Sequence, residues 1–245
     1  MLYYTIQYYY GKNKKDNILK HIQIYNEITT INKMFIIFVS IDSRDINYHN
    51  MVKDNIYEFV HTVYEKCKLN LLILSGYNYG GTIQGLYECY LYIKNKENFN
   101  KNDLIAHFEE DFFPINNIWL KTSIELLNTD KYIYIGEHTP SSTNPESNIN
   151  NTKQISLCNF VNSELVQNYC KTKIACWTDG GYYCSFISNF IKIEEKIGKF
   201  HKGDENTQYD HYIDGILLGE VGFPTQVKDH FEFTSLLRSE YFIHS

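Results

Sequence analysis

The stretch Asp103-Leu-Ile-Ala-His-Phe-Glu-Glu-Asp-Phe-Phe-Pro114 joins the end of an apolar strand to three consecutive acidic residues. Buried charges are costly unless they are paired or coordinate a metal. Alternate side chains of an extended segment lie on one face, so Glu109 and Asp111 are predicted to point together and Glu110 away from them. Two carboxylates at a strand end suit Mg²⁺ or Mn²⁺. A solvated acidic turn after the strand is the alternative interpretation.

The length and composition favour one globular domain. The chain has 245 residues, of which 43% are hydrophobic, enough to bury one large core and too many for a disordered chain. The formal net charge is -6, and the sequence has no sustained basic run. This argues against a nucleic-acid backbone as the main partner, because such proteins carry a basic footprint. It leaves open a nucleotide bound through a metal.

Cysteine spacing and the first residues indicate the compartment that we expect. None of the six cysteines forms a C-x-x-C pair, so zinc ligation has little support. The start of the chain lacks the charged region and apolar core of a signal peptide. The sequence has no apolar run that is long enough to span a bilayer. We therefore expect a cytoplasmic protein with free thiols and no membrane span.

Apolar strands alternate with helical patterns along most of the chain. The predicted strands are Met34–Ile41, Leu69–Leu74, Asp103–Phe108 and Lys131–Gly136, and the predicted helices between them are His49–Cys67, Thr82–Lys94 and Ile115–Asn128. This alternation predicts an α/β fold with a mostly parallel, Rossmann-like sheet flanked by helices. Ligands of such sheets bind beyond the carboxyl ends of the strands. Three polar clusters fall there: Asp42–Asp45, Ser75–Gly81 and Glu109–Asp111.

Two segments are harder to assign. Residues 1–33 have a weak pattern, compatible with a strand at Leu2–Tyr10 and a short helix at Asn17–Glu27, and we interpret them as an N-terminal elaboration on a main domain that covers residues 34–245. The polar stretch 139–153 is too long for an ordinary connection inside a compact domain. A lid beside the strand ends and a disordered insertion without a role are both compatible with its composition.

Three further acids are candidates for a catalytic role. Asp210 and Asp214 are four residues apart in a predicted helix and therefore share one face, where like charges repel. Asp179 lies in the glycine turn Trp177-Thr-Asp-Gly-Gly181. A solvated helix face is the alternative interpretation of the first two.

The order of elements and the acidic motif resemble the nucleotide-sugar glycosyltransferases of the GT-A fold, in the style of family 2 and viral members. The family carries a D-x-D metal motif at a strand end, and this chain has Glu109-Glu-Asp111, with Glu in the first position. The resemblance implies that Asp111 binds the metal directly and that Glu109 binds it through water or holds the donor ribose. It also implies a histidine near the C-terminus as the last metal ligand, for which His230 is the candidate.

The same resemblance implies a donor site. Val39, Ser40 and Asp42 would lie at the base and ribose, with Arg44 nearby. Asn78 and Gly81 would let the backbone approach the nucleotide. Lys228 and Arg238 would contact the pyrophosphate. Ser75-Gly76 departs from the family, where many members carry a base-reading Asp, so UDP-, GDP- and dTDP-sugars all stay open as donors.

The family also implies a general base that takes the proton from the acceptor hydroxyl. This base must stay ionised and lie within reach of the hydroxyl. We rank the candidates Asp214, Asp210 and Asp179, and expect inversion at the anomeric carbon. The acceptor would be a glycan or another hydroxyl compound.

Two other functions compete with this one. A metal-dependent nucleotidyltransferase would share the sheet and the paired acids, but it would normally show a glycine-rich basic loop near the first strand, and residues 40–45 contain no glycine. A non-catalytic module that binds nucleotides or carbohydrates would need no ionised base.

Overall fold

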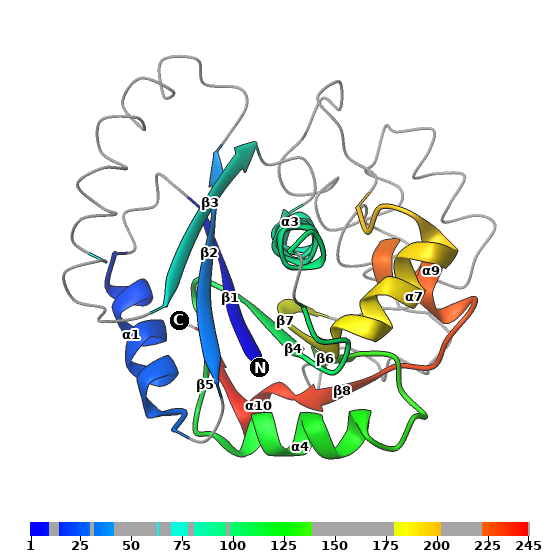
Figure 1. Ribbon diagram of the computed structural model, residues 1–245. Coiled ribbons are helices and arrows are strands. Elements are labelled where there is room, and N and C mark those ends of the chain that lie inside the picture. The colour runs from blue at the N-terminus through cyan, green and yellow to red at the C-terminus, as the bar shows by residue number, and fades with distance from the viewer. Residues whose placement is uncertain are drawn as a thin grey trace, which may run out of the picture.

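The computed structural model describes residues 1–9, 15–29, 32–41, 63, 70–77, 81–96, 99–138, 179–201 and 222–244 (Figure 1). The strands are β1 (Leu2–Tyr9), β2 (Lys33–Ile41), β3 (Leu71–Tyr77), β4 (Leu104–Glu109), β5 (Phe112–Pro114), β6 (Ile135–His138), β7 (Asp179–Phe186), β8 (Thr234–Leu237) and β9 (Phe242–His244). The helices are α1 (Lys15–Glu27), α3 (Gly81–Lys94), α4 (Ile118–Leu127), α7 (Ile187–Ile197), α9 (Gly222–Lys228) and α10 (Arg238–Tyr241). In this part of the chain, none of the helices combines the length and the apolar character needed to cross a membrane.

The main sheet has seven strands in the order β3-β2-β1-β4-β7-β6-β8. All of them run in the same direction except β7, which is antiparallel to both β4 and β6. The carboxyl ends of the parallel strands therefore meet at one edge, which we call the C-terminal edge. The prediction of a mostly parallel sheet flanked by helices is confirmed.

Strand β1 lies in the middle of this sheet, paired along its length with β2 on one side and with β4 on the other. We interpreted residues 1–33 as an elaboration, whereas the structure gives them a central strand and the helix α1. The pattern is weak because β1 mixes aromatic and polar residues. Two of its buried polar groups have partners, since Tyr4 contacts His21 and Thr5 contacts His107, so the strand does not need to be uniformly apolar.

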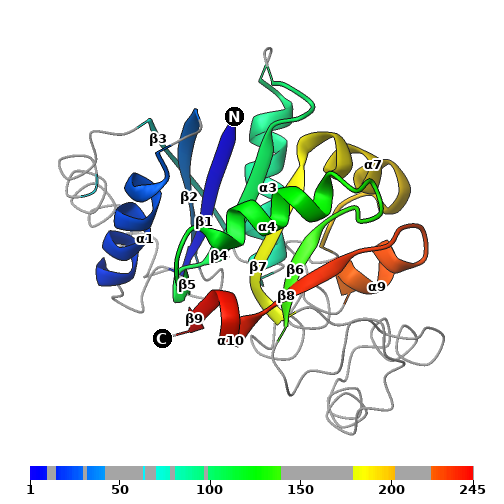
Figure 2. The same cartoon turned by 90° about the horizontal axis from the view of Figure 1, so that it is seen from below.

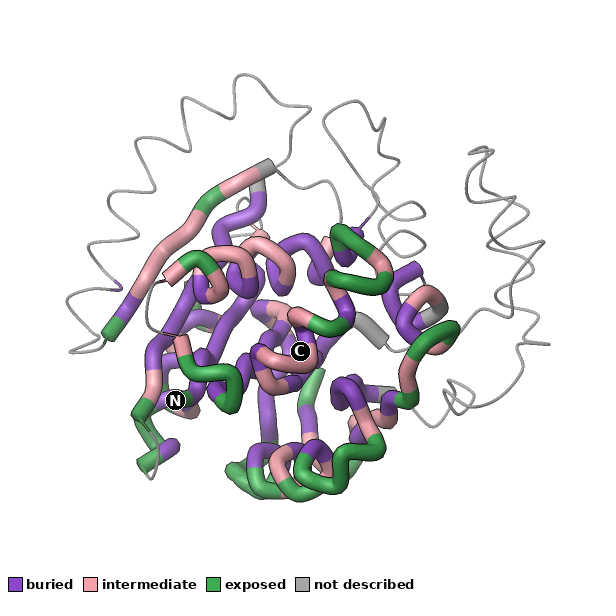
Figure 3. Tube along the Cα trace, turned by 45° about the vertical axis from the view of Figure 1, so that its right-hand side comes forward, coloured by how far each residue is buried: buried purple, intermediate pink, exposed green. Residues whose placement is uncertain are grey.

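Two layers of helices cover the sheet. Helices α1 and α4 pack on one face, where Ile18, Ile22, Trp119 and Leu120 join the core. Helices α3, α7 and α9 pack on the other face, with a separate apolar core beneath them. Figure 2 shows α4 crossing the strands, and Figure 3 shows that the buried residues concentrate in the strands and the inner sides of the helices.

A small ribbon closes the fold beside the acidic motif. Strand β5 follows Asp111 directly and pairs antiparallel with the C-terminal strand β9, with Phe112 opposite His244 and Pro114 opposite Phe242. The rings of Phe112 and Phe242 lie 4.9 Å apart in the core. This pairing brings the end of the chain to the C-terminal edge of β4.

Candidate functional site

Glu109 is the last residue of β4 and lies at the C-terminal edge of the sheet. Its side chain turns toward α3, where the Thr82 hydroxyl donates a hydrogen bond to Glu109 Oε1. Gln7 lies beside Glu109 in the neighbouring strand β1, and its Oε1 accepts a hydrogen bond from the Gly85 amide, 3.1 Å away. The first turn of α3 is thus packed against the strand ends that carry Glu109.

Helix α1 holds the same residue from the opposite face. His21 is fully buried, and its Nε2 lies 3.2 Å from the carbonyl oxygen of Glu109. Its Nδ1 lies 2.8 Å from the hydroxyl of Tyr4. Burial lowers the pKa of His21 to about 3, so the ring is neutral at ordinary pH. Glu109 is therefore fixed by its side chain from α3 and by its backbone from α1.

Asp111 and His244 complete a cluster with Glu109. His244 Nε2 is 3.5 Å from Asp111 Oδ1, and one ligand atom from each of Glu109, Asp111 and His244 lies within 4.8 Å of the others. The two carboxylates are partly buried and His244 is exposed. Glu110, by contrast, is buried. The sequence predicts that it points away from the other two acids, although Glu110 and Asp111 form the turn between β4 and β5 and not an extended segment. We call Glu109, Asp111 and His244 the acidic cluster.

The donor set of the acidic cluster fits a divalent cation. Two carboxylates and one imidazole are ligands that Mn²⁺ accepts, and Mg²⁺ binds through one or two carboxylates with water and phosphate. The hydrogen bond from the Thr82 hydroxyl already holds Glu109 at Oε1. Preorganised ligands of this kind bind a cation without first ordering the chain.

A buried ion pair stands next to the cluster. Arg238, the first residue after β8, donates from Nε to Glu137 Oε2 at 3.0 Å and from Nη2 to Glu137 Oε1 at 2.7 Å. Glu137 is fully buried and also accepts a hydrogen bond from the Gly181 amide at 3.3 Å. The guanidinium lies 5.1 Å from the ring centre of Phe112. Arg238, which the family resemblance places at the pyrophosphate, is therefore already paired with a carboxylate.

Besides Glu109 and Arg238, three predicted donor-site residues lie at or near the C-terminal edge. Val39 and Ser40 lie just before Ile41, the last residue of β2, and pair with Tyr8 and Tyr9. The Val39 side chain is buried in the core, so only its backbone can face a ligand. Gly81 is the first residue of α3 and has φ 59°, a conformation that favours glycine.

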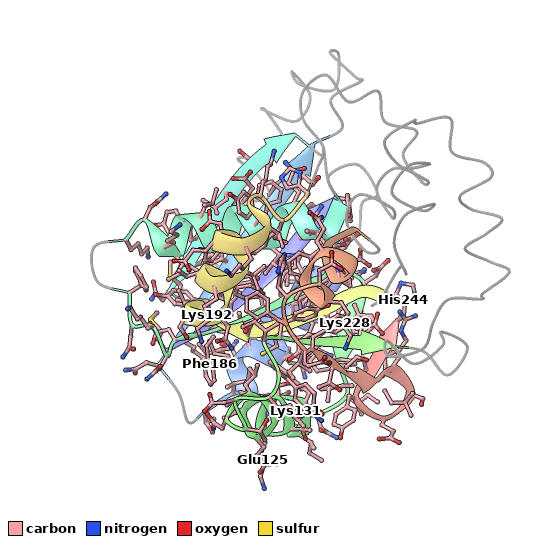
Figure 4. All side chains as sticks on the ribbon, turned by 90° about the vertical axis from the view of Figure 1, so that its right-hand side faces the viewer. Glu125, Lys131, Phe186, Lys192, Lys228 and His244 are labelled. Atoms are coloured by element: carbon pink, nitrogen blue, oxygen red, sulfur yellow. The ribbon has the colours of Figure 1, made fainter. Side chains whose placement is uncertain are left out.

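Lys228 and His230 lie elsewhere. Lys228 ends α9 and pairs with Glu232, and His230 donates its amide to the carbonyl of Val227 at 3.0 Å. Both residues precede β8 and lie toward the end at which the parallel strands begin. Figure 4 labels Lys228 on α9 and His244 at the end of β9. The structure thus brings His244, and not His230, into the acidic cluster.

Several predicted residues fall outside the described part of the chain. These are Asp42, Arg44, Asn78, Asp210 and Asp214, together with the segment 139–153 and nearly all of the helix predicted for residues 49–67. The backbone of Asp179 is described and begins β7 opposite Glu137. Because β7 is antiparallel, it begins at the C-terminal edge.

Sequence reasoning missed His244 and His21 as members of the site, and it did not predict the contact between Thr82 and Glu109. No local sequence pattern points to His244, because only the pairing of β9 with β5 brings it to Asp111. A buried polar residue in the apolar stripe of α1, next to Ile18, Ile22 and Tyr25, is the kind of pattern that could have singled out His21.

Comparisons with known proteins give limited matches. No protein-family model matches the chain, and no curated protein matches its sequence. Among solved structures, glucosyl-3-phosphoglycerate synthase from Mycobacterium tuberculosis, in complex with Mn²⁺, UDP and phosphoglyceric acid, aligns with a TM-score of 0.42 and 8% identity, over 81% of this chain and 65% of that one. S. aureus TarS 1-349 aligns with a TM-score of 0.46 and 12% identity, over 100% of this chain and 60% of that one.

A second structure of S. aureus TarS aligns with a TM-score of 0.49 and 11% identity, over 100% of this chain and 36% of that one. The chain therefore spans between about a third and two thirds of the length of these structures.

Proposed function

We propose that this chain is a metal-dependent glycosyltransferase that moves a sugar from a nucleoside-diphosphate sugar to an acceptor hydroxyl. The observation that carries the proposal is the acidic cluster of Glu109, Asp111 and His244 at the C-terminal edge of a mostly parallel sheet. This edge is where such sheets bind their ligands. The chemistry of the cluster matches the reaction, because sugar transfer builds charge on a leaving diphosphate that a divalent cation stabilises.

The surroundings of the cluster suit a diphosphate. The α3 helix begins at Gly81, beside Glu109, and the amide groups of a helix N-terminus favour an anion. A diphosphate between the cation and the start of α3 would neutralise the charge of both. In this proposal Asp111 and His244 bind Mn²⁺ or Mg²⁺, and Glu109 binds the cation directly or through water. Val39 and Ser40 line the path to the nucleoside.

The base remains one of Asp214, Asp210 and Asp179, with inversion as the stereochemical outcome. Of the three, Asp179 has the support of position, because its backbone begins β7 at the C-terminal edge. The acceptor is proposed to be a glycan or another hydroxyl compound.

The test is release of nucleoside diphosphate from a panel of UDP-, GDP- and dTDP-sugars, with and without Mn²⁺. We expect release that requires the cation, with UDP-sugars as the first candidates. UDP with Mn²⁺ should also raise the melting temperature, because a ligand that binds only the folded state stabilises it. A chain that releases pyrophosphate from nucleoside triphosphates would instead be a nucleotidyltransferase. Binding of UDP without any turnover would support the non-catalytic module.

A further inference from the structure

His21 is an unusual residue for the buried stripe of α1. Its neighbours on that side of the helix, Ile18, Ile22 and Tyr25, fill the core against the sheet. A buried imidazole is costly unless both of its nitrogens have partners. Both do: the ring lies 2.8 Å from the Tyr4 hydroxyl at Nδ1 and 3.2 Å from the Glu109 carbonyl at Nε2.

The directions of these hydrogen bonds follow from their partners. A carbonyl oxygen can only accept, so His21 Nε2 carries the hydrogen and donates it to Glu109. Nδ1 then accepts from the Tyr4 hydroxyl, which burial keeps protonated by raising the pKa of Tyr4 well above its usual value. A single tautomer is therefore selected, and it points one N–H at the backbone of the acidic motif.

The ring also packs against residues on both sides of the motif. Its centre lies 5.8 Å from that of Phe108 and 4.8 Å from that of Phe113. The three residues between Glu109 and Phe113 include Asp111. His21 thus contacts both ends of the segment that carries the two carboxylates. Thr82 holds the Glu109 side chain from the other face.

We infer that His21 is a positioning residue that orients the segment 109–113 through its Nε2 hydrogen bond to the Glu109 carbonyl, and so sets the affinity of the acidic cluster for a divalent cation. The inference rests on the proposed metal site. His21 does not touch the cation or the substrate. It acts on the ligands through the backbone, as residues behind a metal site commonly do, and loss of such a residue typically weakens metal binding by about 10-fold to 100-fold.

The experiment measures the Mn²⁺ dissociation constant of the full chain by electron paramagnetic resonance, which requires no activity. His21→Met removes the Nε2 donor and fills the site with an apolar side chain of similar length. We expect it to weaken Mn²⁺ binding by about 10-fold. His21→Gln places an amide N–H near the position of Nε2 and should recover most of that affinity. Ile22→Ala is the matched control, because it damages the same buried face of α1 without touching the motif.

The outcomes separate the two levels of the argument. If the wild-type chain does not bind Mn²⁺, the metal site fails and this inference fails with it. If the wild-type chain binds Mn²⁺ and His21→Met binds equally well, the positioning role alone is wrong. Equal losses in His21→Met and Ile22→Ala would show a merely structural role and would also overturn it.

A second measurement covers the case in which His21→Met does not fold. Long-range ¹H–¹⁵N spectra of the wild-type chain should show His21 as the neutral Nε2–H tautomer. The opposite tautomer, or a ring that exchanges between the two, would contradict the hydrogen bond on which the inference depends.

Discussion

Asp111 directly precedes β5 and His244 ends β9, so the two residues lie at the same end of the β5–β9 pairing, with His244 Nε2 3.5 Å from Asp111 Oδ1. The C-terminal strand therefore contributes a side chain to the same cluster as the end of β4. Because β9 is paired with β5, the position of His244 is set by backbone hydrogen bonds and by the packing of Phe242 against Phe112. Binding of a cation would depend on the docking of this last strand.

This relationship predicts different effects for two C-terminal histidines. His244→Ala should weaken Mn²⁺ binding by roughly 10-fold or more, because it removes one of the protein ligands. His230→Ala is the matched control and should leave the Mn²⁺ dissociation constant unchanged, since His230 lies near the start of β8. Calorimetric titration with Mn²⁺ measures both. A loss in His230→Ala alone would restore the assignment made from the sequence and remove His244 from the site.

Asp111→Asn tests the acidic motif itself. The change preserves the size of the side chain and removes one negative charge, so the fold should survive while Mn²⁺-stimulated turnover is lost. Glu125→Gln, an exposed acid on α4, serves as the control for loss of charge alone. Circular dichroism checks the fold and product release checks the activity. Unchanged turnover in a folded Asp111→Asn variant would mean that the cation binds elsewhere.

The sequence predicts the part of the site that depends on local pattern. An apolar run followed by Glu109-Glu-Asp111 indicates a strand ending in carboxylates, and β4 ends at Glu109. The sequence does not predict His244, because its contact with Asp111 depends on a pairing between distant segments. Nor does it distinguish His244 from His230, since the two differ in which end of the sheet they approach and not in local pattern.

For a related reason, the sequence does not show that residues 1–33 supply a central strand of the sheet. A central strand of a parallel sheet is usually a continuous apolar run, but β1 contains Thr5 and Gln7, both fully buried. Both have partners on other elements, since His107 contacts the Thr5 hydroxyl and the Gly85 amide donates to Gln7 Oε1. Local patterns cannot show such compensation, because the partners lie far away in the chain.

The ion pair between Arg238 and Glu137 should matter more to stability than an exposed pair would. Removing one partner of a buried pair leaves an uncompensated charge, which typically costs about 3–5 kcal/mol. We expect Arg238→Met to lower the free energy of unfolding by about 3 kcal/mol, somewhat less than the upper value because Arg238 itself is partly exposed. The double variant with Glu137→Gln should recover part of the loss. Urea denaturation measures both, and additive losses would contradict the pairing.

Two buried histidines predict a dependence of stability on pH. Burial lowers the pKa of His21 and of His107 to about 3, whereas the ordinary value is about 6.5. As the pH falls below about 6.5, the unfolded chain takes up protons that the folded chain does not, so this stability is complete above that pH and is lost toward pH 3. Each histidine contributes a slope of about 1.4 kcal/mol per pH unit.

The measurement is the urea midpoint of the wild-type chain and of His107→Gln between pH 7 and pH 5. The variant should show a shallower fall in stability on acidification, whatever its stability at pH 7. Ile193→Val, a core change on the same face of the sheet, is the control without a titratable group and should keep the wild-type slope. A His107→Gln slope equal to that of the wild type would mean that His107 is protonated in the folded state.

A side chain added at position 181 would disturb the core next to the acidic cluster. A Cβ atom at this position would lie 2.5 Å from Cδ2 of the Phe112 ring and 2.6 Å from its Cγ, closer than carbon atoms approach. The ring cannot easily move away, because Phe112 is fully buried, with Phe242 4.9 Å away and Arg238 5.1 Å from its ring centre. Overpacking of this kind typically costs about 1–3 kcal/mol.

We therefore expect Gly181→Ala to lower the free energy of unfolding by about 1–3 kcal/mol and also to weaken Mn²⁺ binding, because Phe112 follows Asp111 directly and pairs with His244. Phe112→Leu makes room for the methyl group, so the double variant should lose less stability than the sum of the two single variants. A double-mutant cycle measured by urea denaturation gives this coupling. Strictly additive losses would show that the added methyl group displaces something other than the Phe112 ring.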